Sequence, residues 1–76
     1  MIAIINESEE IIPYKTGRQF EVIPEDKGYG LYLDNDIIEE YGSEELAVKA
    51  MAKVVEKIEN DVDYIEMKQV HKELEV

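Results

Sequence analysis

Apolar and polar positions alternate over two segments, 19–23 and 29–33, and this spacing predicts a pair of β-strands. The residues between them include Pro24 and Gly28, which favour a turn. Two alternating runs joined by a glycine-containing turn are typical of a β-hairpin. We expect Leu31 and its alternate neighbours on the buried face of this hairpin.

Shorter apolar runs flank the hairpin on both sides. The run 1–5 is rich in isoleucine and predicts a strand, and 37–41 predicts another. The run 11–14 contains Pro13, which lacks an N–H, so it is expected to be an edge strand or an extended segment.

The apolar spacing becomes helical after Gly42. Ser43 is a good N-cap, and Glu44 and Glu45 follow it at the positive end of the helix dipole. The helix is expected to end near residue 59, before Asn60-Asp61. Its apolar face would consist of Ala47, Ala50, Met51, Val54, Val55 and Ile58.

The last part of the chain predicts one more strand, over 62–70, and a polar tail, 71–76, that frays. Residues 1–76 would then form a single α+β domain with two layers. One layer is an antiparallel sheet of three to five strands, and the other is one helix packed on one face of it. The order along the chain is β-hairpins, then the helix, then a final strand.

Acidic residues dominate the charge of the chain. It carries 19 Asp and Glu against 8 Lys and Arg, a net charge of −11. Residues 1–46 hold 12 acids and 3 bases, a net charge of −9. The stretch Asp34–Glu45 contains six acids and no base. Such a field repels nucleic acid and anionic membranes and attracts basic protein surfaces, so we expect neither direct nucleic-acid binding nor membrane binding.

Few residues suit common catalytic or metal sites. The chain has one His and no Cys, and its glycines match no phosphate-binding loop. Asp34-Asn35-Asp36 begins like a calcium-binding loop, but the residues that such a loop needs next do not follow. His71 lies in the polar tail, where a solvated side chain is expected. The sequence therefore predicts a protein that is not an enzyme, with no catalytic residue, cofactor or metal site.

The same features bear on location. No secretory leader is visible at the N-terminus, because the apolar run 1–5 has no basic region before it. No apolar run approaches the roughly 18–20 residues of a membrane span. Together with the lack of Cys, these observations favour the cytoplasm.

Five of the six aromatic residues are tyrosines, a residue type enriched in strands and at protein interfaces. If Tyr29, Leu31 and Leu33 face the helix, Tyr32 and Tyr64 belong to the outer sheet face. That face is either a solvated strand surface or a surface for a second copy or another protein.

The segment Tyr41-Gly42-Ser43-Glu44-Glu45-Leu46-Ala47 resembles the helix start of small uncharacterised proteins of phages and prophages of Gram-positive bacteria. The isoleucine-rich first strand, the hairpins and the helix 48–58 are similar too. The resemblance assigns no catalytic residue. It implies an accessory role, of the host-takeover or counter-defence type.

Two functions follow from these patterns. The first is a small interaction module that binds a basic protein surface or a second copy of itself. The alternative is a mimic of nucleic acid that inhibits a DNA- or RNA-binding enzyme. The residues expected to bind the partner are Asp34, Asp36, Glu39, Glu40, Glu44, Glu45, Tyr32 and Tyr64.

Overall fold

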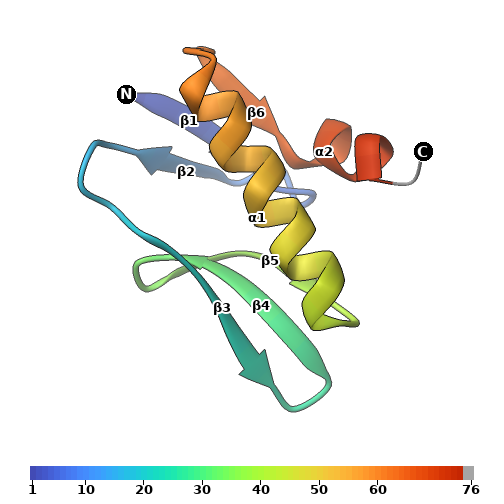
Figure 1. The fold of residues 1–76 in the computed structure, drawn as a ribbon. Helices are drawn as coiled ribbons and strands as arrows, with labels where there is room; N and C mark the ends of the chain where they lie inside the picture. Colours follow the sequence, from blue (N-terminus) through green and yellow to red (C-terminus); the bar gives the residue numbers. More distant parts are fainter. Residues whose placement is uncertain (75–76) are drawn as a thin grey trace.

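The computed structural model describes residues 1–74, which form six strands and two helices (Figure 1). The α+β class is as predicted. The elements in chain order are β1 (Ile2–Ile5), β2 (Ile11–Tyr14), β3 (Phe20–Glu25), β4 (Gly28–Leu33), β5 (Asp36–Tyr41), α1 (Glu44–Glu59), β6 (Tyr64–Glu66) and α2 (Met67–Leu74). Neither helix is long and apolar enough to cross a membrane.

The strands form two three-stranded sheets, where the sequence predicted one antiparallel sheet. One is the meander β3-β4-β5, which contains the predicted hairpin. The other has the order β2-β1-β6, and its β1–β6 pair is parallel. Parallel neighbours need a long connection, and β2 to β5 and α1 all lie between β1 and β6 in the sequence.

The β1–β2 hairpin is closed by the side chain of Asn6. Its Oδ1 accepts a hydrogen bond from the backbone N–H of Glu10, and its Nδ2 donates one to the Glu10 carboxylate. Asn6 is the one buried polar residue among the described residues. These bonds satisfy its amide, so its burial fixes the turn at modest cost.

One hydrophobic core joins both sheets and both helices. Helix α1 crosses in front of the sheets and packs against β3, β4 and β5 (Figure 1). As predicted, α1 ends at Glu59 and is capped by Ser43, whose Oγ accepts a hydrogen bond from the Leu46 N–H. The buried core side chains include Ile4, Leu31, Leu33, Ile38, Val54, Ile65, Met67 and Val70.

The prediction of a strand over 62–70 is correct only for Tyr64–Glu66. The chain then turns directly into α2, which continues to Leu74. Met67 and Val70 are fully buried, and their spacing places both on the helix face that packs against the core. Of the predicted frayed tail 71–76, residues 71–74 are helical, and 75–76 lie outside the described residues.

Candidate functional site

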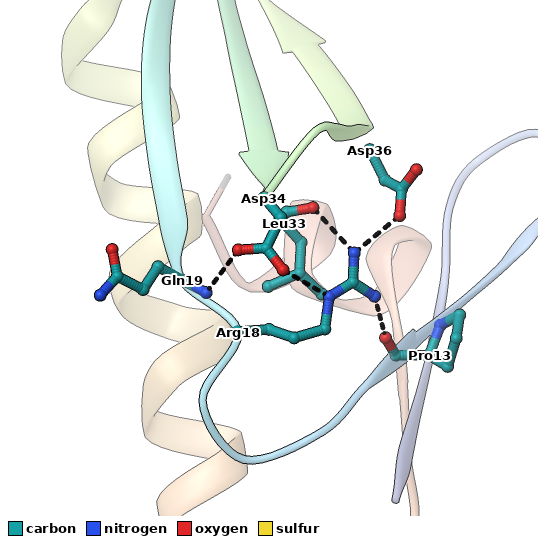
Figure 2. A network of polar contacts seen from close by, with 6 residues as sticks. All are labelled: Pro13, Arg18, Gln19, Leu33, Asp34 and Asp36. Carbon is teal, nitrogen blue, oxygen red and sulfur yellow. Dashed lines mark hydrogen bonds and ion pairs between the residues drawn. The ribbon is translucent and has the colours of Figure 1, made fainter.

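The acids of the stretch Asp34–Glu45 do not form one surface. Figure 2 shows the Arg18 guanidinium between β2 and the β4–β5 turn. Its Nε lies 2.8 Å from Asp34 Oδ2, and its Nη2 lies 2.7 Å from Asp36 Oδ2. It also donates hydrogen bonds to the carbonyl oxygens of Pro13 and Leu33. Arg18 therefore pairs with two of the predicted partner-binding acids, balances one of their two negative charges, and links the two sheets.

The Asp34 carboxylate is held in its charged form. The hydrogen bond from Arg18 is the main cause that lowers its pKa below the ordinary 3.8, and the backbone N–H of Gln19 adds to this effect. A carboxyl group with a lowered folded-state pKa stabilises the fold above its unfolded pKa. That stabilisation is lost as the pH falls through the folded-state value.

We therefore expect Asp34→Asn to lower the melting temperature by several degrees at neutral pH, and to weaken the loss of stability below about pH 4. Asn tolerates the left-handed backbone at this position (φ 55°), so the variant tests the charge rather than the turn. Thermal unfolding between neutral pH and about pH 2.5 measures both effects. Asp26→Asn, an equal charge change in the β3–β4 turn, is the control. Equal acid sensitivity of the two variants would contradict the role of the Arg18 link.

The β3-β4-β5 sheet has a face turned away from α1, which we call the outer face. In the strand register, Glu21 is opposite Tyr32, and Tyr32 is opposite Ile37. Ile23 and Glu40 lie on the same side, because both are opposite Gly30. The outer face thus comprises Glu21, Ile23, Glu25, Gly30, Tyr32, Ile37 and Glu40.

Tyr32 lies at the centre of the outer face. Its ring extends along the strand over Gly30, where a Cβ would approach within 2.6 Å of the ring. Its hydroxyl donates a hydrogen bond of 3.0 Å to Glu25 Oε1, and this bond is the main cause that raises the Tyr32 pKa. The lack of a side chain at Gly30 therefore leaves room for the ring, and the hydrogen bond to Glu25 holds its hydroxyl.

The outer face combines an apolar centre with an acidic rim. Tyr32 and Ile23 are half-buried, and Ile37 is exposed. Three acidic side chains surround them, and none of the seven outer-face residues is basic. The acids of the rim, all exposed, are Glu21, Glu25 and Glu40.

Of the eight predicted partner-binding residues, only Tyr32 and Glu40 share the outer face. Tyr64 is 58% exposed but belongs to β6 in the other sheet. Glu44 and Glu45 are exposed in the first turn of α1, where Glu45 pairs with Lys49 at 3.0 Å. Sequence reasoning missed the contribution of Glu21 to the outer face. The alternation of Glu21 with Phe20 already indicated that Glu21 points away from the core.

A second cluster lies in a cleft of about 480 Å³ beside α2. His71 Nδ1 lies 2.5 Å from Glu7 Oε2, and His71 Nε2 shares a hydrogen bond of 2.8 Å with the Tyr41 hydroxyl. His71 Nε2 is also 3.9 Å from Glu39 Oε2. The expectation of a solvated His71 was wrong, because α2 carries this residue into the cleft.

A β-bulge directs Glu39 into the same cleft. Leu31 pairs with Glu39, but the next residue, Tyr32, pairs with Ile37, so Ile38 is an extra residue in β5. An extra residue bends a strand and redirects its side chains. Glu39 Oε1 consequently accepts a hydrogen bond of 3.1 Å from the backbone N–H of Glu7.

Burial determines the ionisation of two groups in this cleft. It is the main cause that raises the pKa of Glu39, and the nearby Glu7 and Glu40 carboxylates add to it. Burial also raises the pKa of Tyr41, with further contributions from Glu39 and Glu7. Tyr41 is therefore a neutral phenol at ordinary pH, suited to hydrogen bonding rather than to nucleophilic attack.

The two regions offer different chemistry. The outer face offers aromatic and aliphatic contact inside a negative rim, which suits a macromolecular partner. The cleft offers an imidazole nitrogen and carboxylate oxygens, which suit protons or a metal ion. The chain matches no family model, and neither a curated protein nor a solved structure is significantly similar to it.

Proposed function

We propose that this protein is a small, acidic, non-enzymatic interaction module that binds a partner protein with a basic surface through its outer face. The observation that carries the proposal is the position of Tyr32, with Ile23 and Ile37 beside it, inside a rim of three glutamates. Interfaces commonly combine an aromatic or aliphatic centre with a polar rim. The energy of such contacts is concentrated in a few central residues, often including tyrosine.

Charge argues for a different protein as the partner rather than a second copy. In a two-fold symmetric dimer each surface meets itself. Two outer faces would therefore bring Glu21, Glu25 and Glu40 close to the same three residues of the other copy. Like charges at an interface cost several kcal/mol. A partner with lysines or arginines around an apolar patch complements the same rim.

The resemblance to phage and prophage proteins supplies a context for this proposal. It suggests that the partner is a protein of the bacterial host and that binding takes place in the host cytoplasm. The search for a partner therefore begins in lysate of a Gram-positive bacterium.

The nucleic-acid mimic receives less support. A mimic needs acids that face solvent in ranks spaced like phosphates. Within the predicted stretch, Asp34 and Asp36 bind Arg18, and Glu39 points toward His71. The two functions can still be distinguished by adding DNA to the captured complex, because DNA should displace the partner of a nucleic-acid mimic.

The test compares two triple variants with an equal change of charge. Glu21→Gln/Glu25→Gln/Glu40→Gln removes the rim charge but leaves an oxygen at position 25 to accept the Tyr32 hydrogen bond. Glu59→Gln/Asp61→Asn/Asp63→Asn removes the same charge at the end of α1 and just after it, where all three residues are exposed. We expect the wild-type and control proteins to capture a basic partner at about 50 mM salt and to lose it near 500 mM. The rim variant should lose at least about tenfold in affinity.

Quantitative pull-down with mass spectrometry measures the capture, and circular dichroism confirms that all variants are folded. Equal affinity of the rim and control variants would contradict binding through the outer face. Capture of a nucleic-acid enzyme that DNA displaces, with both variants equally weakened, would favour the mimic instead.

A further inference from the structure

We propose that Glu7, Glu39 and His71 form a binding site for a divalent transition-metal ion, with Zn²⁺ as the best match. The site is separate from the outer face and does not depend on the proposed function. It lies in the cleft between the β1–β2 turn, β5 and α2.

The first argument is the kind of ligands present. An imidazole nitrogen with two carboxylate oxygens suits Zn²⁺ and its first-row neighbours, whereas Mg²⁺ and Ca²⁺ prefer oxygen ligands alone. His71 is the single histidine of the chain, and it lies among carboxylates rather than in solvent. The cluster is thus more than a group of surface acids.

The second argument is distance. One ligand atom from each of the three side chains lies within 4.8 Å of the other two. Bonds of about 2.1 Å to a zinc ion keep ligand atoms roughly 3.4–4.2 Å apart. Small side-chain rotations therefore bring the three atoms into range of one ion. Three protein ligands also leave coordination positions for water on the open side of the cleft.

The third argument is how the ligands are held. Tyr41 orients the His71 ring by a hydrogen bond of 2.8 Å and packs edge-on against it at 5.4 Å. Glu39 is fixed by the bulge of β5 and by the Glu7 N–H at 3.1 Å. Groups that orient metal ligands in this way are a regular part of metal sites.

An ion at this position would act as a cross-link. Glu7 and His71 are 64 residues apart in the sequence, and both lie close to Glu39. Metal bound only by the folded state stabilises that state. The site would therefore fasten α2 and the β1–β2 turn to β5.

The test uses protein without a histidine tag, titrated with ZnCl₂ and, for comparison, MgCl₂. We expect saturable binding of one Zn²⁺ by calorimetry, a rise in melting temperature with Zn²⁺ concentration, and a shift of the His71 ring signals in the NMR spectrum. MgCl₂ should produce none of these changes at the same concentration. His71→Ala and Glu39→Gln should each weaken Zn²⁺ binding at least about tenfold.

Glu59→Gln is the matched control, because it removes one exposed carboxylate at the end of α1, outside the lining of the cleft, and should leave the affinity unchanged. If His71→Ala does not fold, Glu39→Gln and the wild-type NMR titration decide the result. Unshifted His71 signals up to about 1 mM Zn²⁺ would overturn the proposal. Equal Zn²⁺ affinity of the wild type and the folded ligand variants would overturn it too, because binding would then belong to other acids.

Discussion

Replacing Gly28 with alanine is expected to lower the free energy of unfolding by about 2–5 kcal/mol, a large share of the stability of a domain of this size. Gly28 has a φ of +157°, a backbone conformation that residues with a side chain rarely adopt. A Cβ at this position would also overlap the carbonyl oxygen of Tyr41. Because that oxygen belongs to the backbone of β5, the clash can be relieved only by displacing β4 from β5.

Two other glycines provide matched controls. Gly17 also has a positive φ, of 101°, but no heavy atom lies within 4 Å of a Cβ built there. Gly17→Ala should therefore show only the strain of the backbone, about 1–2 kcal/mol. Gly42→Ala meets neither obstacle and should have little effect. Urea unfolding of the three variants separates clash from strain, and a Gly28→Ala protein as stable as Gly17→Ala would contradict the β4–β5 packing.

Replacing Val70 with aspartate is expected to cost about 3–5 kcal/mol, because it places an unpaired charge in the core. Val70 is fully buried on the inner face of α2. Its environment depends on residues 67–74 being helical, so the variant tests the main correction to the sequence prediction. Loss of α2 would also withdraw His71 from Tyr41.

Gln69→Asp is the control for this substitution, since it adds the same charge at an exposed position of α2. Because the variant loses the hydrogen bond from Gln69 Nε2 to Glu73 Oε2 and places a like charge near Glu73, it should lower the free energy of unfolding by no more than about 1 kcal/mol. Thermal unfolding followed by circular dichroism measures both variants. If Val70→Asp were as stable as Gln69→Asp, Val70 would not face the core, and the position of α2 would be wrong.

The β3–β4 hairpin and α1 could be predicted because their signals are local. Alternation places Leu31 and Leu33 on one side and Tyr32 on the other, and the structure confirms this. Ser43 marks the start of α1 through a hydrogen bond within the first turn. Both patterns are short-range and require no knowledge of the rest of the fold.

Helix α2 could not be recognised from alternation alone. Ile65 and Met67 are two residues apart, which fits a strand as well as the strand-to-helix junction that the structure has. The separation of three residues between Met67 and Val70 does fit a helix. The helix is favoured over a strand because it buries the side chains of both Met67 and Val70 fully in the core.

The clusters depend on contacts distant in sequence. Arg18 reaches Asp34 across 16 residues, and His71 reaches Glu7 across 64. The bulge that directs Glu39 into the cleft appears only in the pairing of β4 with β5. A charge count therefore revealed the acidity of the chain but not which acids are paired with other side chains within the fold.

The most direct measurement of the central claim is site-specific photocrosslinking in bacterial lysate. p-Benzoylphenylalanine is placed at position 32, at the centre of the outer face, and separately at position 64, an exposed tyrosine of the other sheet. We expect a light-dependent adduct with a basic protein from position 32, reduced at high salt and in the rim variant. Position 64 should give no such adduct. The absence of an adduct from position 32, with or without one from position 64, would contradict the outer face as the binding surface.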